Sequence, residues 1–378
     1  MNSDLRQCEL EQAACGDYLR GDPTHKGAML GAADWVKEES LIRESLRSPF
    51  PWFGGKSKVA DLVWDRFGNV PNYIEPFFGS GAVLLARPHK PHTETVNDLD
   101  CMVANFWRAL QHEPEAVAEH ADNPVNEADQ HARHLWLCSQ EDFRERMKVD
   151  PEFYDAKIAG WWVWGQCIWI GSGWCSRQLP HLGDAGTGVH RQLPHLGNAG
   201  KGVNRKRPHL GNAGTGVVEC LSDLTSGTRE RAFLLGYMQE LAERLRHVRV
   251  CCGDWSRICG PSPTFKHGIT AVFLDPPYAD EAERQSDLYA SDSGDVAHTV
   301  REWALANGDN PLLRIALCGY EGEHQMPNTW ECVRWKARGG YGSQRADGKN
   351  DNAGRERLWF SPHCLTVGGL FAGMETTP

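Results

Sequence analysis

The sequence predicts an α/β fold organised around a sheet of parallel strands. Short apolar segments of strand length alternate with segments of helix length from residue 58 to residue 363. Strands that are joined through helices run parallel, which distinguishes this pattern from a series of hairpins. Acidic or glycine-rich loops directly follow several of the apolar segments. In such sheets, ligands bind beyond the carboxyl ends of the strands.

The elements fall into two stretches of the chain, 48–111 and 218–365. In the first stretch we expect a helix, a strand, a short helix, a strand and a helix, at KVADLVWDRF, NYIE, GAVLLA, TETVND and CMVANFWRALQ. In the second stretch we expect a helix over 228–248 and then strands at VRVCC, AVFL, LLRIALCGY and RERLWF. The helix has an apolar stripe. Its members are Phe233, Tyr237, Leu241, Leu245 and Val248.

Residues 112–217 interrupt the α/β pattern and are predicted to form an insert. The part from 112 to 160 holds twelve acids and five bases, and its expected helices carry no catalytic pattern. A tryptophan-rich run, WWVWGQCIWIGSGW, covers 161–174. Three near-identical copies of PHLGNAGTGV then repeat every 14 residues, and their prolines and glycines indicate turns, not helices,. Residues 1–47 are predicted to be an N-terminal extension, and 366–378 a tail.

Composition excludes several classes of protein. Apolar residues make up 40% and charged residues 24%, as in globular proteins,. The formal net charge of -10 argues against a chain that coats nucleic acid uniformly,. Thirteen cysteines without a CxxC pair disfavour a zinc ribbon or a disulfide scaffold,. The run at 161–174 is too short and interrupted for a membrane span. With no signal peptide visible, we expect a cytoplasmic protein with reduced thiols.

The most informative motif is Asp275-Pro276-Pro277-Tyr278, which follows the apolar strand 271–274. The prolines stiffen the loop, so that it presents a carboxylate, a carbonyl and an aromatic ring in fixed directions. A carboxylate and a carbonyl together can accept both hydrogens of an exocyclic amine and leave the nitrogen lone pair available for attack. The aromatic ring can stack on a base. The alternative is a proline-rich turn that only closes the strand.

A second motif, EPFFGSG, follows the first strand and leads into a helix. Its candidate ligand-binding residues are Glu75, Pro76, Phe77, Gly79 and Gly81. Glycines at a strand–helix junction let a ligand approach the backbone closely. The spacing is not GxGxxG, so a dinucleotide is not the expected ligand. A tight turn without a ligand is the alternative.

Acids also end two further strands. Asp98 could accept hydrogen bonds from ribose hydroxyls. Asp254 could accept one from an adenine amino group, with Trp255 packed on the ring. Acids in such places often cap the next helix, which is the alternative for each of them.

Taken in order, FPWFGGK, EPFFGSG, NDLD, CGDW and DPPY resemble the Dam-like N6-adenine DNA methyltransferases in their alpha arrangement. The insert and the ending RERLWFSP are similar to the phage and prophage members. The resemblance covers about residues 49–363. It implies a Rossmann-like, S-adenosylmethionine-dependent methyltransferase sheet, with catalytic segments 48–111 and 218–365 and a target-recognition region at 112–217. The enzyme would then act in a bacterial or phage-infected cell.

The resemblance also implies roles for individual residues. The methionine end of S-adenosylmethionine would lie among Trp52, Phe53, Gly54, Gly55, Lys56, Glu75, Pro76, Phe77, Gly79 and Gly81. Asp98 would hold the ribose, and Asp254 and Trp255 the adenine ring. The family more often has Phe at the position of Trp255. The DPPY loop would hold an adenine that has been rotated out of duplex DNA.

Positive charge is concentrated in the insert, where 161–217 holds six bases and one acid. These bases are the candidate DNA contacts: Arg177, Arg191, Lys201, Arg205, Lys206 and Arg207. Glycine-rich turns bring backbone amides close to phosphates, although a solvated surface loop is the alternative. The repeats also place His181, His195 and His209 periodically. No other ligand-type residue accompanies them, so no metal is expected. The tryptophans of 161–174 are interpreted as packing residues.

Other activities remain open at this level. The same DPPY loop serves cytosine-N4 methyltransferases, and protein glutamine methyltransferases use a related loop that usually begins with Asn. A DNA-binding protein without catalysis is the alternative that is not an enzyme. Asp275, the FGGK loop and the basic insert favour an enzyme that acts on duplex DNA. The sequence gives no indication of a partner restriction endonuclease or of an oligomeric state.

Overall fold

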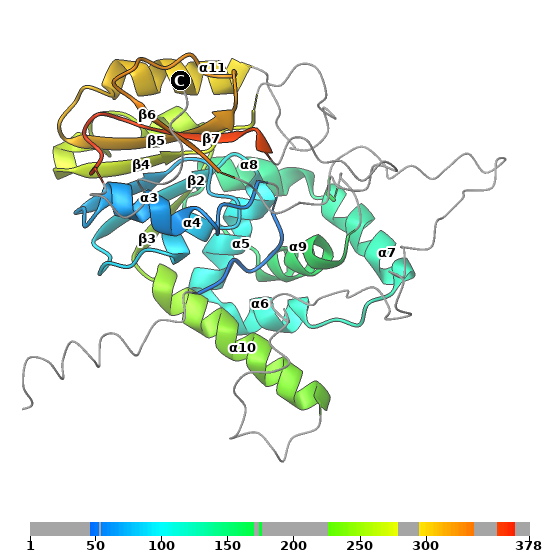
Figure 1. The fold of residues 1–378 in the computed structure, drawn as a ribbon. Coiled ribbons are helices and arrows are strands. Elements are labelled where there is room, and N and C mark those ends of the chain that lie inside the picture. The colour runs from blue at the N-terminus through cyan, green and yellow to red at the C-terminus, as the bar shows by residue number, and fades with distance from the viewer. Residues whose placement is uncertain are drawn as a thin grey trace, which may run out of the picture. The chain divides into compact units, whose positions relative to one another are not determined.

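The computed structural model describes residues 46–52, 54–169, 174–175, 226–278, 295–335 and 354–366. All of them belong to the compact unit Ser45–Pro378, which contains a seven-stranded sheet (Figure 1). The strands are β1 (Asn72–Glu75), β2 (Thr93–Asp98), β3 (Val248–Cys252), β4 (Thr270–Leu274), β5 (Leu313–Tyr320), β6 (Glu331–Arg334) and β7 (Glu356–Phe360). The predicted α/β fold class is confirmed.

The strands lie in the order β3-β2-β1-β4-β5-β7-β6. The first five strands of this order run parallel, and β7 runs antiparallel between β5 and β6. From β1 the chain moves outward to β2 and β3 and then returns to β4 on the other side of β1. The loops after β1 and β4 therefore start side by side at the carboxyl edge, where parallel α/β sheets bind ligands.

Six strands were predicted from their apolar runs, but β6 was not. Its sequence, ECVR, is mostly exposed and contains a single aliphatic residue, so it lacks an apolar pattern. The antiparallel direction of β7 was not predicted either. Strand β7 follows β5 and β6 in the chain, lies between them in the sheet and runs in the opposite direction to both.

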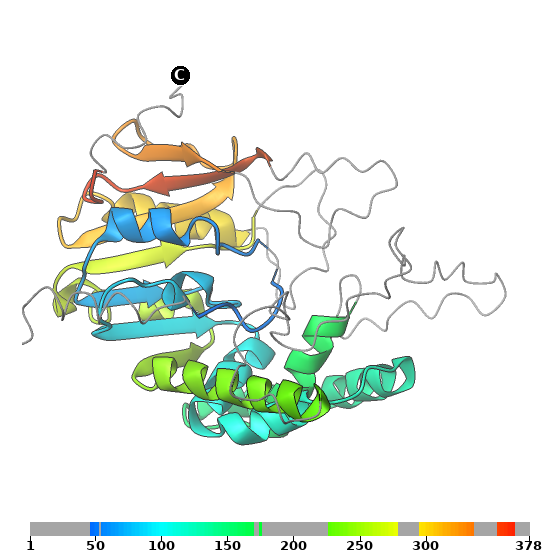
Figure 2. The same ribbon diagram turned by 60° about the horizontal axis from the view of Figure 1, so that its bottom comes forward.

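Helices cover both faces of the sheet. Side chains of β4 alternate between two apolar clusters, with Ala271 and Phe273 in one and Val272 and Leu274 in the other. Helix α11 (Asp295–Asn307) contributes to the second cluster, and Figures 1 and 2 show it on the face opposite α3. The first cluster includes helices α3 (Ala60–Phe67), α4 (Ala82–Leu85), α5 (Cys101–His112) and α10 (Ser226–Leu245).

The described part of the insert is helical and shares this first cluster. Its helices are α6 (Pro114–Ala121), α7 (Glu127–Cys138), α8 (Glu141–Val149) and α9 (Ala156–Ile168). Helix α9 is apolar around most of its circumference and buries Trp162 and Trp164 almost completely. At Gly160, a Cβ would lie 2.3 Å from the Cβ of His120 on α6. The tryptophans described here therefore serve packing, as predicted, and the glycine allows two helices to approach closely.

Helix α10 buries Leu241 and Leu245 of the predicted stripe, but the stripe differs toward its N-terminal end. Leu234, Met238, Leu241 and Leu245 are buried, whereas Phe233 is 37% exposed. From Phe233 to Leu245 the predicted stripe advanced by four residues at each step, and on a helix of 3.6 residues per turn such a stripe drifts around the axis. Its last member, Val248, lies beyond the helix and begins β3. Alternating steps of four and three residues keep the observed stripe on one side. The prediction of Phe233 as a core residue was therefore wrong.

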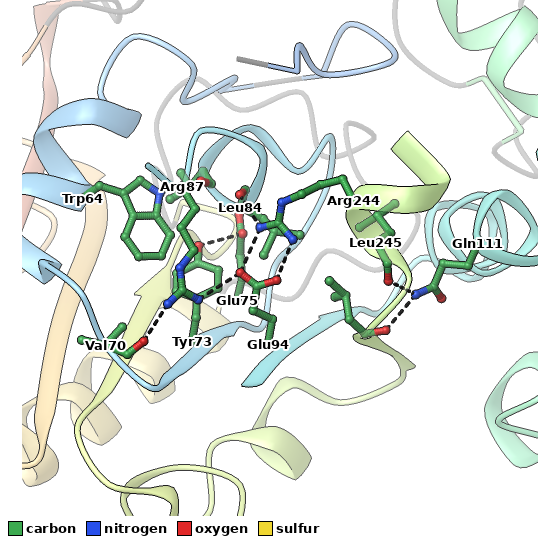
Figure 3. A network of polar contacts seen from close by, with 12 residues as sticks. Trp64, Val70, Tyr73, Glu75, Leu84, Arg87, Glu94, Gln111, Arg244 and Leu245 are labelled. Atoms are coloured by element: carbon green, nitrogen blue, oxygen red, sulfur yellow. Dashed lines mark hydrogen bonds and ion pairs between the residues drawn. The ribbon is translucent and has the colours of Figure 1, made fainter. Parts of the chain in front are cut away.

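A buried ionic network ties α10 to the sheet (Figure 3). Arg244 of α10 donates to both carboxylate oxygens of Glu94 on β2, at 2.7 and 2.9 Å. Arg87, which follows α4, donates to Glu94 at 3.0 Å and to the carbonyl of Val70 at 2.6 Å. Arg244 also donates to the carbonyl of Leu84, at 3.0 Å. Two cations thus share one buried anion and fix α4, and with it the preceding glycine loop, against β2 and α10.

Candidate active site

Four loops meet at the carboxyl edge of the sheet, one after each of the neighbouring strands β3, β2, β1 and β4. Asn97 on β2 joins two of them. Its side-chain amide donates to the carbonyl of Pro76 at 3.1 Å and to that of Gly253 at 2.9 Å. Asn97 is buried and was not singled out from the sequence, although it belongs to the NDLD motif. It positions the loops after β1 and β3 relative to each other.

The glycine loop after β1 has the backbone that its sequence suggested. Gly79 and Gly81 adopt positive φ angles of +46° and +69°, which L-residues rarely adopt,. A Cβ on Gly79 would come within 2.3 Å of Nε1 of Trp52. The Trp107 indole also donates to the carbonyl of Gly79, at 2.9 Å. Trp52 therefore lies directly against Gly79, which brings the PFPWFGGK segment and the glycine loop together as the sequence indicated.

Asp98 links the end of β2 to the glycine loop. Its carboxylate accepts hydrogen bonds from the backbone N–H of Gly79 at 2.8 Å and from that of Asp100 at 2.9 Å. Burial, and then the neighbouring Asp100 carboxylate, raise the pKa of Asp98 to about 7. A raised pKa means that the folded chain prefers Asp98 protonated. Its contribution to stability is therefore present at low pH and is lost as the pH rises through about 7.

Two other acids of these loops, Asp100 and Asp254, cap the helices that follow them. Asp100 caps α5 through a hydrogen bond from the N–H of Met102 at 2.8 Å. Asp254 caps the short 3₁₀ helix η2 (Trp255–Ile258) through the N–H of Ser256 at 2.9 Å, and it is exposed. Capping was the alternative considered for Asp254, and the structure shows that Asp254 does cap a helix.

Two aromatic side chains of the candidate donor site lie next to each other. The rings of Phe77 and Trp255 are 6.2 Å apart between centroids and inclined by 32°. They belong to the loops after β1 and β3, on either side of the loop that follows β2. Their half-buried faces, next to Asp254, offer a surface for a flat ring.

Glu75 has a different environment from the one expected of a donor contact. It is 3% exposed, and its carboxylate accepts a hydrogen bond from the hydroxyl of Tyr73 at 2.8 Å. Burial is the largest cause that raises the pKa of Glu75, and the Asp275 carboxylate adds to it. Figure 3 shows Glu75 and Tyr73 beside the arginine–glutamate network. The structure thus places the Glu75 side chain in the interior, below the glycine loop.

The DPPY loop forms a polar cluster with Lys56, which ends the Gly54-Gly55-Lys56 segment, and with Glu356, which begins strand β7. Nζ of Lys56 donates to Oδ2 of Asp275 at 2.7 Å and to the carbonyl of Gly54 at 2.8 Å. The Tyr278 hydroxyl lies 2.8 Å from Oε2 of Glu356 and 3.2 Å from Oδ1 of Asp275. The structure thus places Lys56 of the FGGK motif in direct contact with Asp275 of the DPPY loop.

Burial and charge fix the protons of this cluster. Burial alone would lower the pKa of Lys56, but the Asp275 carboxylate raises it well above its usual value, so Lys56 is a cation. Burial, followed by the charge of Asp275, raises the pKa of Tyr278, which therefore keeps its proton and acts as a donor. Burial also raises the pKa of Glu356, whereas Lys56 opposes this rise.

Three residues of this cluster were missed in the sequence. Besides Glu356, the Tyr320 ring meets the Tyr278 ring edge-to-face, with centroids 4.6 Å apart, and the Trp335 ring centroid is 5.7 Å from Nζ of Lys56. All three come from the part of the chain that contains the antiparallel strand. An acid at the start of the predicted RERLWF strand, between two arginines, was the one available indication, and the strand's direction could not be inferred from it.

Several predicted residues lie outside the described part of the chain. These are Phe53, Arg177, Arg191, Lys201, Arg205, Lys206 and Arg207. The three PHLG repeats lie there as well. Among the described residues, no group of three or more His, Cys, Asp or Glu side chains is arranged to hold a metal ion. No helix among them is long and apolar enough to cross a membrane.

The acid that ends β2, the glycine loop after β1 and the DPPY loop after β4 thus lie along one edge of the sheet, and they are the motifs that resemble methyltransferases dependent on S-adenosylmethionine. The family model described as D12 class N6 adenine-specific DNA methyltransferase matches residues 52–157. The match begins at Trp52 and includes the glycine loop, Asp98 and the first helices of the insert. No curated protein matches the chain. This likeness over residues 52–157 supports N6-adenine DNA methyltransferase activity with S-adenosylmethionine as methyl donor.

Proposed function

We propose that the enzyme methylates adenine at one short sequence in duplex DNA, with Asp275 and Tyr278 holding a base that has left the helix. The observation that supports this assignment most strongly is the ion pair between Lys56 and Asp275, 2.7 Å long, at the switch between β1 and β4. It brings the motif nearest the donor loop and the motif expected to bind the amine into direct contact.

The residues on the donor side fit S-adenosylmethionine. Asp98 presents a carboxylate, the group that accepts hydrogen bonds from ribose hydroxyls, beside the Gly79 backbone. The Phe77 and Trp255 rings offer aromatic faces for an adenine, and Asp254 is exposed next to them. We therefore assign the adenosine part to these residues and the methionine part to the segment from Trp52 to Lys56 and the glycine loop.

On the substrate side, the chain has the groups needed to hold an amine. The Asp275 carboxylate and the Pro276 carbonyl would accept the two hydrogens of the adenine amine, which directs the nitrogen lone pair outward. Lys56 fixes one oxygen of Asp275 and keeps the carboxylate oriented. Tyr278 supplies a ring on which the base can stack. S-adenosylmethionine supplies a methyl group that is already activated, so the protein's task is mainly to align the reacting atoms.

The base must leave the duplex before it can reach this loop. Rotating it out costs a few kcal/mol, which stacking and hydrogen bonds in the pocket offset. We assign the phosphate contacts that hold the duplex to the bases of the insert, from Arg177 to Arg207, because this stretch carries the strongest local positive charge,. Within the family, the motif order supports the alpha arrangement of the phage type.

Expression followed by sequencing tests this function. DNA from cells that make the wild-type chain should carry N6-methyladenine in one short motif, detected by modification-sensitive sequencing. Asp275→Ala should abolish this mark while the purified variant still binds S-adenosylmethionine in calorimetry. Asp65→Ala, an exposed carboxylate on α3, is the matched control and should leave the mark intact. Soluble wild-type protein that leaves no N6-methyladenine, or that marks cytosine, would refute the proposal.

A further inference from the structure

We propose that Glu356 is a positioning residue for methyl transfer, which engages the Tyr278 hydroxyl and thereby keeps one oxygen of Asp275 available to the adenine amine. The inference rests on the proposed roles of Asp275 and Tyr278. It concerns a residue of the last strand, distant in sequence from every motif that suggested the function.

The geometry presents a competition for one proton. The Tyr278 hydroxyl lies between two carboxylates, 2.8 Å from Glu356 and 3.2 Å from Asp275. A hydroxyl has a single proton to donate. When Glu356 accepts it at the shorter distance, Oδ1 of Asp275 keeps its lone pairs for the substrate. Without Glu356, the hydroxyl can turn fully to Asp275 and occupy the oxygen that the adenine amine needs.

The two oxygens of Asp275 then have separate tasks. Oδ2 is engaged by Lys56 at 2.7 Å. Oδ1 is left for the amine, provided that Tyr278 donates elsewhere. Before substrate arrives, Lys56 donates to Oδ2 and to the carbonyl of Gly54, and Glu356 supplies the acceptor for the Tyr278 hydroxyl.

Glu356 is well placed for such a task because its backbone belongs to the sheet. It begins β7, pairs opposite Tyr320 of β5 and is 5% exposed. Strand β5 lies between β4 and β7 in the sheet. The hydrogen bond from Tyr278, after β4, to Glu356 on β7 therefore reaches across β5. Among the described residues, the charged or titratable groups that face Glu356 are Lys56 before α3, Asp275 and Tyr278 after β4, and Cys318 and Glu323 on and after β5. Lys56 is the one cation among them.

A purely structural role would predict different behaviour, and a double-mutant cycle separates the two. Single-turnover methylation rates are measured at saturating S-adenosylmethionine for the wild type, Glu356→Gln, Glu356→Ala, Tyr278→Phe and the Glu356→Ala/Tyr278→Phe double variant. Glu356→Gln should stay within about 3-fold of the wild type, because the amide oxygen still accepts the hydroxyl proton. Glu356→Ala should lose about 10- to 100-fold, the effect expected of one hydrogen bond to a charged group.

The decisive comparison is the effect of Glu356→Ala when the hydroxyl is absent. In the Tyr278→Phe background no proton competes for Asp275, so the loss should fall to about 3-fold or less, a clear departure from additivity. The affinity for S-adenosylmethionine, measured by calorimetry, should be the same in all variants. This measurement also shows that each variant is folded. If Glu356→Ala does not fold, Glu356→Asp replaces it, since its carboxylate is one methylene further from Tyr278.

The outcomes are distinguishable. Equal losses from Glu356→Ala in both backgrounds, or a Glu356→Gln variant as impaired as Glu356→Ala, would overturn the inference while the proposed function stands. A wild-type enzyme that methylates no adenine would overturn the proposed function and this inference with it.

Discussion

Replacing Gly79 by alanine should push Trp52 away from the glycine loop. Gly79 has a φ of +46°, and a Cβ there would lie 2.3 Å from Nε1 and 2.5 Å from Cδ1 of the Trp52 indole. Two costs add. An L-residue in the left-handed region costs about 1–2 kcal/mol, and inserting a methyl group into packed surroundings costs about 1–3 kcal/mol. We therefore expect Gly79→Ala to lower the free energy of unfolding by about 2–5 kcal/mol.

A glycine elsewhere in the chain isolates the first of these costs. Gly322, in the turn after β5, has a φ of +83°, but a Cβ there would meet no atom within 4 Å. Gly322→Ala should therefore lose only the conformational part, about 1–2 kcal/mol. The contact with Trp52 accounts for the difference between the two variants, which urea unfolding followed by circular dichroism resolves.

A second variant tests the collision itself. In a Trp52→Ala background, Gly79→Ala should cost no more than Gly322→Ala, because the indole is no longer present. Binding of S-adenosylmethionine should weaken in Gly79→Ala but not in Gly322→Ala, since the Gly79 backbone holds Asp98. Equal destabilisation by the two alanines, or a Gly79→Ala cost that persists without Trp52, would refute this reasoning.

Three further predictions address charge. Ribose hydroxyls favour the ionised form of Asp98, whose pKa lies at about 7, so S-adenosylmethionine should bind about tenfold more weakly at pH 6 than at pH 8, and calorimetry with Asp98→Asn should show no such dependence,. Glu94→Gln leaves two buried arginines without their anion and should lower the free energy of unfolding by about 3–5 kcal/mol, whereas Glu145→Gln on the surface should change it by less than about 1 kcal/mol. Neutralising the basic run 205–207 should reduce the slope of log K for DNA binding against log salt concentration by up to about 0.9 per lost phosphate contact. An unchanged slope would indicate that this run is a solvated loop without phosphate contacts.

The strands and the site loops were predictable because their determinants are local. Each central strand is a short apolar run, and each site loop begins where such a run ends in an acid or a glycine. Once the sheet is parallel, those loops must share one edge. Local pattern also gave the existence of α10. The local pattern did not identify which face of α10 is buried. Two neighbouring apolar stripes are separated by only a small rotation about the helix axis, and packing against α5 and α6 decides between them.

Partners from distant parts of the chain were not predictable. Lys56 and Asp275 are 219 positions apart, and each looked like part of a separate motif. Glu356 reaches the site because β7 inserts antiparallel between β5 and β6, a pairing that no local pattern encodes. The Asn97 amide was missed because its role is to join two backbones, and a buried asparagine at a strand end has no characteristic spacing.

The position of β7 in the sheet also affects the order in which the site can be assembled during synthesis. A nascent chain that has emerged through β4 already contains Lys56 and Asp275, and β1 and β4 can pair. Tyr278, however, has to wait for Glu356, 78 positions later, before it obtains its second carboxylate. The hydrogen bond between Tyr278 and Glu356 cannot form until residue 356 has been synthesised. The amine-binding corner is thus completed by the last strand of the sheet to leave the ribosome, and until then it is unfinished.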